Sequence, residues 1–124
     1  MKLKKRAAAL VMALTLCMAA GATVNAATVS TSEFGTMTYS LSRSGATVTA
    51  VTKTTKAAPK LITKLEVQVN STGKTIVNTS ATKTNATNNT IIKATNYTST
   101  KLAAFSTHEA RGTSSVARYM AEVF

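Results

Sequence analysis

The chain has 124 residues, 15 lysines and arginines against four acidic residues, and a formal net charge of +11 at pH 7. It contains one histidine, one cysteine, no aspartate and no tryptophan. This length fits one domain, and so few ligand side chains exclude an ordinary metal centre.

The first segment has the pattern of a cleavable signal peptide. Residues 1–6 carry four positive charges, and residues 7–20 carry none. This apolar run is shorter than the roughly 20 residues that a membrane-spanning helix needs, and small residues follow it. We expect cleavage after Ala26, behind Val24-Asn25-Ala26, with Ala20-Gly21-Ala22 as an earlier alternative site. An uncleaved N-terminal anchor is the other interpretation. Nothing after residue 26 is long and apolar enough to span a membrane as a helix.

The expected mature chain, residues 27–124, keeps 11 basic and four acidic residues, so its charge is 11 − 4 = +7. It has no cysteine, because Cys17 leaves with the signal, and the fold must therefore form without disulfides. This is more typical of a bacterial exported protein than of a small eukaryotic one. We predict that the protein is secreted and extracellular, with association to the cell wall as a further expectation.

The mature chain begins with a predicted flexible leader, residues 27–33, and a single β domain is predicted over 34–124. From Phe34 the pattern alternates with a period of two, and Met37, Tyr39 and Leu41 form one face of a half-buried strand. Ser44-Gly45 predicts a tight turn. Residues 46–55 then predict a second strand, which completes a hairpin.

A second hairpin is predicted after a break at Lys56–Pro59. The clearest strand follows this break, with Lys64, Glu66, Gln68 and Asn70 facing out and the alternate side chains facing in: Leu61, Thr63, Leu65, Val67 and Val69. Residues 71–74 predict a turn, and residues 75–83 predict the partner strand.

The last third of the mature chain predicts a turn and up to three strands. Residues 84–90 have turn-forming composition, and a weaker strand is predicted over 91–98. Residues 101–109 alternate again, and a bend at residues 111–114 precedes a final strand over 115–124. That strand has its apolar side chains on one face, Ala117, Tyr119, Ala121 and Val123. The fold class predicted is all-β, a small antiparallel sandwich or barrel of six to seven strands.

Catalytic chemistry has few candidate residues in this sequence. A serine could pair with His108, but Glu109 is adjacent and adjacent strand residues point to opposite faces, so it cannot orient the imidazole directly. We therefore expect His108 to be an outward-facing or hydrogen-bonded strand residue. Glu66 and Glu122 are predicted to be outward-facing residues paired with lysines rather than a catalytic carboxylate pair. Neither a phosphate-binding glycine loop nor a cofactor site is predicted.

The basic residues are dispersed rather than clustered, which is typical of a solvated surface and also draws a domain to anionic polymers. In an exported bacterial protein these polymers would be wall polymers or lipid headgroups, and another surface protein is a further candidate partner. Nucleic acid is not expected, because the protein is exported and its basic residues are not interleaved with aromatic residues. The candidate contacts are Lys53, Lys64, Lys74, Lys83, Lys93 and Lys101.

Ala104-Phe105-Ser106-Thr107-His108-Glu109-Ala110, followed by Gly112 and Ser115 through Tyr119, resembles the C-terminal segment of small exported Ser/Thr-rich β proteins from Gram-positive bacteria. The resemblance implies an exported β domain and carries no activity over to this chain. We predict a secreted, non-enzymatic β-sandwich that acts by surface contact, through cell-wall association or partner binding. The alternative is a cationic, bacteriocin-like effector that acts on membranes.

Overall fold

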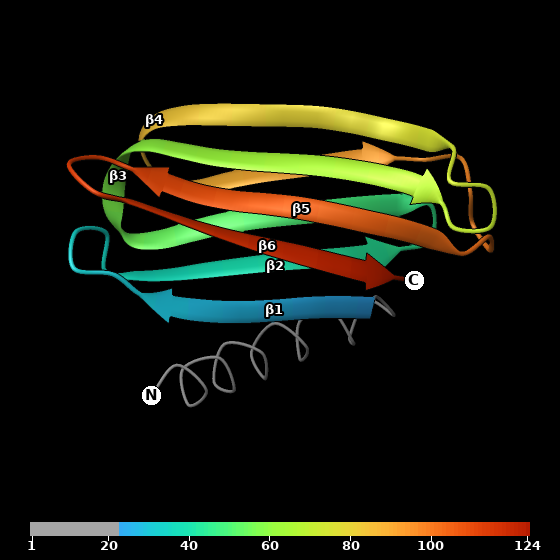
Figure 1. Cartoon of the computed structure of the whole chain (residues 1–124), viewed down its shortest axis with the longest axis horizontal. Coiled ribbons are helices and arrows are strands. Elements are labelled where there is room, and N and C mark those ends of the chain that lie inside the picture. Colours follow the sequence, from blue (N-terminus) through green and yellow to red (C-terminus); the bar gives the residue numbers. More distant parts are fainter. Residues whose placement is uncertain (1–22) are drawn as a thin grey trace.

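The computed structural model describes residues 23–124, which form six antiparallel β-strands and no helix (Figure 1). This confirms the predicted all-β fold class, a sandwich-like sheet that is nearly closed on itself. In chain order the strands are β1 (Thr23–Ser30), β2 (Thr36–Ser44), β3 (Thr47–Val69), β4 (Thr75–Ala94), β5 (Leu102–Arg111) and β6 (Ser115–Val123).

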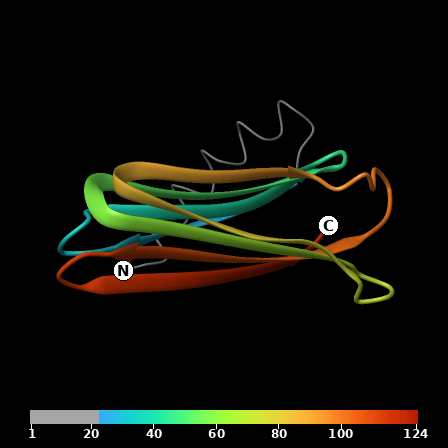
Figure 2. The ribbon, with the colours of Figure 1, turned by 90° about the horizontal axis from the view of Figure 1, so that it is seen from above.

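The long strand β3 belongs to both layers of the sandwich. Its first half pairs with β2, from Ser44↔Thr47 to Met37↔Thr54, and its second half pairs with β5 from Lys60↔Arg111 onward. β4 runs beside β3 through both halves, so the pair bends back on itself as one ribbon (Figure 2). One layer is therefore β1, β2 and the first half of β3 with the second half of β4. The other layer is β6, β5 and the second half of β3 with the first half of β4.

The bend lies where the sequence predicted a break and a turn, and those two predictions are wrong in detail. The break predicted at Lys56–Pro59 lies inside β3, where the β3–β4 register shifts between Lys53 and Ala58. The turn predicted over residues 84–90 lies inside β4, where Asn85 has a φ of 48°. A register shift bends a ladder without ending it, and asparagine tolerates positive φ better than most residues. The turn-forming residues therefore mark a corner rather than a chain reversal.

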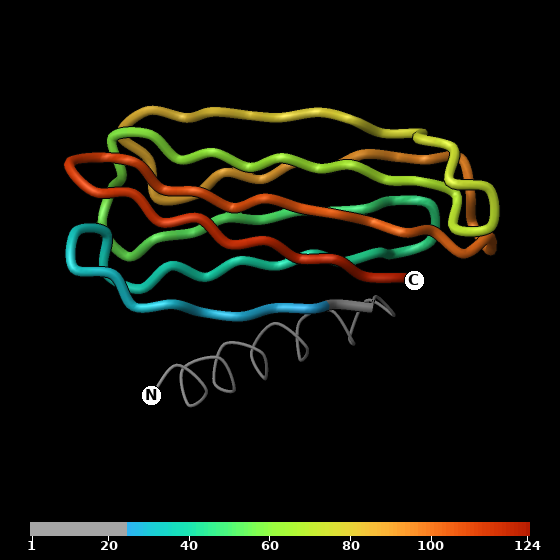
Figure 3. The backbone as a smooth tube through the Cα atoms, viewed as in Figure 1, coloured from blue at the N-terminus to red at the C-terminus, as the bar shows by residue number. Residues whose placement is uncertain are grey.

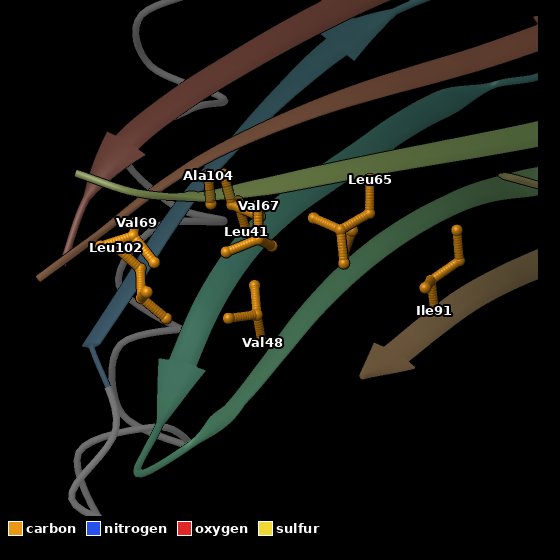
Figure 4. Close-up of a cluster of buried hydrophobic side chains, with 9 residues drawn as sticks. Leu41, Val48, Leu65, Val67, Val69, Ile91, Leu102 and Ala104 are labelled. Atoms are coloured by element: carbon orange, nitrogen blue, oxygen red, sulfur yellow. The ribbon is translucent and has the colours of Figure 1, made fainter. Parts of the chain in front are cut away.

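The interior of the sandwich consists of two apolar clusters separated by polar side chains. Every second side chain of β3 points into the core, and along the strand these inward residues pass from one apolar cluster through polar residues to the other cluster and back. One cluster, shown in Figure 4, contains Leu41, Val48, Ala50, Leu65, Val67, Val69, Ile91, Leu102 and Ala104. The other contains Val29, Phe34, Met37, Tyr39, Ala58, Leu61 and Ala110. Between them lie the buried polar residues Thr52, Thr54, Thr63, Asn89, Ser106 and His108, which we call the polar layer.

Residues 27–33, predicted to be a flexible leader, are ordered by pairing and by a local turn. Ala27 through Ser30 pair with Tyr39 through Thr36 of β2. The following turn is closed by the main-chain N–H of Thr31, which donates to the Gly35 carbonyl oxygen at 2.8 Å, and Phe34 is buried. An edge strand is held in place by a partner ladder and an inward side chain such as Val29. The predicted signal peptide, residues 1–26, lies largely outside the described residues.

The apolar face of β6 points outward, not into the core. The register pairs Phe105 with Ala121 and Ala103 with Val123, on the solvent side of β5. Tyr119 and Val123 are consequently exposed. Glu122, predicted to face outward, instead points toward β1, because it lies on the opposite face of the strand. The core side of β6 is contributed by the half-buried Val116, Met120 and, just beyond the strand, Phe124.

Asparagine side chains join the two layers along both open sides of the sandwich. On one side, the end of β6 that carries Glu122 approaches β1 (Figure 3), and Asn25 Nδ2 donates to Glu122 Oε2 at 2.6 Å. On the other side, Asn89 Nδ2 in the second half of β4 donates to the carbonyl oxygens of Ala81 at 2.8 Å and Leu61 at 2.7 Å. These contacts connect the layers where no backbone ladder between them is recorded in residues 23–124.

Arg43 secures the end of the sandwich that holds the β2–β3 turn. Its guanidinium group donates to four main-chain oxygens: Gly45 at 2.8 Å, Tyr97 at 2.8 Å, Thr100 at 2.7 Å and Phe124 at 3.1 Å. A planar guanidinium can reach divergent acceptors that an ammonium group cannot satisfy together. Arg43 therefore ties the segment between β4 and β5 to the last strand.

We predict that Arg43→Ala and Arg43→Lys both destabilise this end. Loss of charged donors to these carbonyls should lower the free energy of unfolding by about 2–3 kcal/mol for the alanine variant. Lysine should recover less than half of the loss, because one ammonium cannot replace the fork. Urea denaturation measures the change, and hydrogen exchange of residues 95–101 localises it. An alanine variant as stable as the original chain would contradict this role.

Candidate functional site

The outer face of the β4–β3–β5–β6 layer presents its side chains in rows across the strands. The register aligns Ser80, Lys64, Thr107 and Tyr119 in one row, from β4 to β6. The next row contains Asn78, Glu66, Phe105 and Ala121. We call this surface the outer face. It gathers residues from four strands that are distant in the sequence but adjacent in the sheet.

A shallow groove of about 660 Å³ lies on this outer face, lined by Lys64, Leu65, Glu66, Asn78, Thr79, Ser80, Phe105 and Thr107. Glu66 Oε2 accepts hydrogen bonds from Gln68 Nε2 at 2.8 Å and from Thr75 Oγ1 at 3.3 Å. These contacts fix the carboxylate beside Phe105. The groove therefore combines one aromatic ring with amide, hydroxyl, carboxylate and ammonium groups.

Large apolar side chains continue from the groove toward β6. Phe105 is 42% exposed, Tyr119 75% and Val123 53%. Single exposed apolar residues are common, but three on adjacent strands of one face form a patch of the kind that marks interaction sites. At the other end of the same face, a second hollow is lined by Pro59, Lys60, Arg111, Gly112 and Thr113. The outer face thus has an aromatic end and a basic end, with Lys64 between them.

The six lysines predicted as contacts do not form one site. Lys64 lies in the groove. Lys53 and Lys93 belong to the other layer, on β3 and β4. Lys83 is exposed on β4, and Lys74 and Lys101 lie in the segments that flank the end of β3. Lys60 and Arg111 were not among the predicted contacts, because only the β3–β5 register shows that they are neighbours.

The one histidine of the sequence lies at the centre of the polar layer. His108 is fully buried, and its Nε2 lies 2.7 Å from Ser106 Oγ while its Nδ1 lies 2.8 Å from Thr52 Oγ1. Thr52 Oγ1 in turn lies 2.7 Å from Thr63 Oγ1, which donates to the Asn89 carbonyl oxygen at 3.1 Å. This places His108 in the hydrogen-bonded alternative of the sequence prediction and not in the outward-facing one.

Proton counting along this chain of contacts assigns the tautomer of His108. Thr63 gives its only hydroxyl proton to the Asn89 carbonyl, so Thr63 must accept from Thr52. Thr52 has then no proton left for the imidazole, and His108 Nδ1–H must donate to Thr52 Oγ1. Nε2 is consequently the bare acceptor, and Ser106 Oγ–H donates to it.

This Ser106–His108 pair has the polarity of a hydrolase nucleophile and base, but its surroundings differ from those of a hydrolase. Ser106 is only 4% exposed and His108 is inaccessible, so a substrate cannot reach either atom. Thr52, not a carboxylate, holds Nδ1. Glu109 lies on the other face of β5, where it forms an ion pair with Arg111 at 2.6 Å. The pair therefore contributes to the packing of the core.

The expected roles of Glu66 and Glu122 are also replaced by specific contacts. Glu66 binds Gln68 and Thr75 in the groove, and Glu122 binds Asn25 between the layers. Glu33 accepts from the main-chain N–H groups of Thr113 and Ser114 at 2.9 and 2.7 Å, and these bonds lower the pKa of the Glu33 carboxyl, with the Ser114 contacts as the largest cause. Each of these glutamates thus has a defined structural partner.

Residues 23–124 hold no group of three or more histidine, cysteine or acidic side chains that could bind a metal ion. Within the same range, no helix has the length and hydropathy needed to cross a bilayer. Comparisons with protein-family models, with curated proteins and with solved structures found no significant match to this chain. The geometry of the chain itself is therefore the basis for a functional proposal.

We predict that the two ring nitrogens of His108 give the NMR signature of the Nδ1–H tautomer at pH 7. The reason is that the hydrogen bonds from His108 through Thr52 and Thr63 to the Asn89 carbonyl oxygen all point in the same direction. Because the sequence has one histidine, a long-range ¹H–¹⁵N spectrum of labelled protein reads it without overlap. Thr63→Val removes the hydroxyl that accepts the proton of Thr52. Thr52 can then donate to Nδ1 of His108, so the preference for the Nδ1–H tautomer should weaken. An Nε2–H spectrum in the original chain would contradict the assignment.

We also predict a loss of stability between about pH 6.5 and pH 4. Burial lowers the pKa of His108 to about 4, against a smaller opposing effect of a backbone hydrogen bond to Val51. Below about pH 6.5 the unfolded chain binds a proton that the folded chain excludes, so the free energy of unfolding falls by up to about 1.4 kcal/mol per pH unit. Above pH 6.5 the stabilisation is complete. Urea midpoints at pH 7, 6 and 5 measure the slope.

His108→Gln is the control for this pH dependence. Glutamine is neutral throughout and can both donate and accept within the polar layer. The variant should be less stable at pH 7 but should lose little further stability between pH 6.5 and 5, above the range in which glutamates titrate. An equal slope in both proteins would assign the pH dependence to another group.

Proposed function

We propose that this chain is an exported, non-enzymatic β-sandwich that binds an anionic polymer of the cell wall along its outer face. The observation that carries the proposal is the groove beside exposed Phe105 and Tyr119, with a second hollow at Lys60 and Arg111 on the same face. Wall polymers combine sugar rings with phosphate or carboxylate groups. This surface offers a suitable contact for each part.

The aromatic end fits the sugar part of such a polymer. A sugar ring has an apolar face of C–H groups and an edge of hydroxyl groups. Phe105 and Tyr119 can pack against the face, while Asn78, Ser80 and the Glu66 carboxylate can exchange hydrogen bonds with the hydroxyls. A few polar groups around an apolar floor are the usual composition of a binding site.

The basic end fits the anionic part. Lys60 and Arg111 are directly paired across β3 and β5, and Lys64 points to the same face four residues further along β3. All three are exposed, but Arg111 is ion-paired with Glu109, so Lys60 and Lys64 carry most of the attraction for an anionic chain, which is modest and screened by salt. A polymer that lies along β3 can meet all three in succession.

The non-enzymatic part of the proposal rests on where the reactive groups lie. The chain's one histidine is sealed in the core with Ser106. Glu66 is the carboxylate in the groove, and its neighbours there are hydroxyl, amide and ammonium groups rather than a second acid. This environment supports binding more readily than acid–base hydrolysis, which needs two carboxyl groups across the scissile bond.

We predict that Lys60→Gln/Lys64→Gln weakens retention on Gram-positive wall sacculi by about tenfold at low salt, since two exposed contacts of about 0.7 kcal/mol are lost. The matched control is Lys53→Gln/Lys93→Gln, which removes the same charge from the other layer. Sedimentation with sacculi at 20 and 300 mM salt measures the bound fraction. Equal losses in both variants would show that net charge acts without the outer face.

Phe105→Thr tests the aromatic end independently of charge. We expect it to weaken retention on sacculi several-fold at both salt concentrations, because stacking is not screened. Ile92→Thr, an exposed apolar residue on the other layer, is its control and should change nothing. Retention of the Phe105 variant at the original level would remove the groove from the proposal.

The cationic membrane effector remains the rival function, and vesicle leakage separates the two. The exposed apolar patch could contact a bilayer as well as a sugar. We expect no dye release from anionic lipid vesicles at concentrations that saturate sacculi. Leakage that Phe105→Thr abolishes would favour the membrane effector. Unchanged binding to sacculi stripped of their phosphate polymers would indicate a protein partner or peptidoglycan itself.

A further inference from the structure

The described part of β1 contains residues on both sides of the cleavage site predicted after Ala26. The strand runs from Thr23 to Ser30 and pairs with β2 at eight positions, from Thr23↔Arg43 to Ser30↔Thr36. Cleavage after Ala26 would remove the first four of these eight residues. Half of an edge strand of the sandwich would then be absent from the exported protein.

The lost half would leave backbone groups of β2 without their partner strand. Leu41 pairs with Asn25 and Arg43 pairs with Thr23. Leu41 is fully buried in one apolar cluster, and Arg43 holds four main-chain oxygens at the adjacent end. An unpaired ladder at this position would open an edge of the sheet beside both features.

Asn25 makes the link between the layers that cleavage after Ala26 would also remove. Its Nδ2 donates to Glu122 Oε2 at 2.6 Å, and the two residues are 97 positions apart in the sequence. Without Asn25, the half-buried Glu122 carboxylate would lose this partner. A charged group that loses its hydrogen bond on a partly buried strand face is costly.

The earlier site satisfies the peptidase and keeps every residue of β1 that the structure describes. Ala20-Gly21-Ala22 has alanine at both positions that flank the middle residue, which is the small-x-small pattern that signal peptidases accept. We propose that cleavage occurs between Ala22 and Thr23, so that the exported domain keeps all of Thr23–Ser30, which pair with β2. A host signal peptidase hydrolyses this amide bond with one water, which leaves a carboxylate on Ala22 and an amine on Thr23.

This inference rests on the proposed export and changes one part of it. The exported chain would have 124 − 22 = 102 residues rather than 124 − 26 = 98. Its charge is +7 in either case, because residues 23–26 carry no ionisable side chain. The outer face and its binding chemistry are unaffected, so the two proposals can fail separately.

The test is the intact mass and N-terminal sequence of the protein secreted by a Gram-positive host that expresses the full 124-residue chain. We expect Thr-Val-Asn-Ala-Ala-Thr as the N-terminal sequence. A mature chain that begins at Ala27 would overturn the inference and leave export intact. A chain retained in the membrane fraction with its residues 1–22 attached would overturn both export and the cleavage site.

A pair of variants adds a second reading that does not depend on the folded product. Ala22→Leu places a bulky residue beside the proposed scissile bond, and pulse-chase labelling should show precursor accumulating several-fold. Ala26→Leu is the matched control and should be processed at the original rate, with Thr23 still at the N-terminus. If instead Ala26→Leu slows processing and Ala22→Leu does not, the later site is the one used.

Discussion

The fold depends on one constraint: alternate side chains of β3 must supply the core of both layers. A strand places every second residue on one face, so the inward positions of the 23-residue strand extend from Val48 to Val69 on either side of a bend. The bend between Lys53 and Ala58 turns the first set of inward residues toward the second. Because β2, β4 and β5 all take their register from β3, the positions of the outer face and of the core follow from this one strand.

The polar layer in the middle of this core has a cost that its hydrogen bonds offset in part, because Thr54 Oγ1 and Asn89 Oδ1 are buried without a hydrogen-bond partner among the described residues. Burying hydroxyl and imidazole groups without partners would be expensive, and Thr52, Thr63, Ser106 and His108 instead satisfy one another in a single direction. Replacing one member leaves another unsatisfied, whereas an apolar residue tolerates a neighbour's change more readily. This layer gives the interior a specific arrangement that two apolar clusters alone would not impose. No disulfide among the described residues contributes to that specificity.

Much of the fold was predictable from the sequence, and the site much less so. The two hairpins and their inward faces follow from period-two burial, and Met37, Leu41, Leu65 and Val67 lie where that pattern places them. Local composition could not distinguish a corner from a break at Lys56–Pro59, since both use the same residues. The face of β6 was wrong because Tyr119 and Val123 look like core residues until their pairing with Thr107 and Ala103 is known. The groove depends on cross-strand neighbours, which a single sequence does not contain.

The open sides of the sandwich, where the edges of its two layers meet, have a mechanical consequence. At β1–β6 and along β4, the layers are joined by side-chain contacts, including those of Asn25, Arg43 and Asn89, while the strands within each layer are joined by main-chain hydrogen bonds. Shear between the layers therefore strains side-chain contacts and the β3–β4 corner. A force applied to a polymer bound along one layer would be carried by the main-chain hydrogen bonds between the strands of that layer. These bonds share the force along the strands, and little of it reaches the other layer.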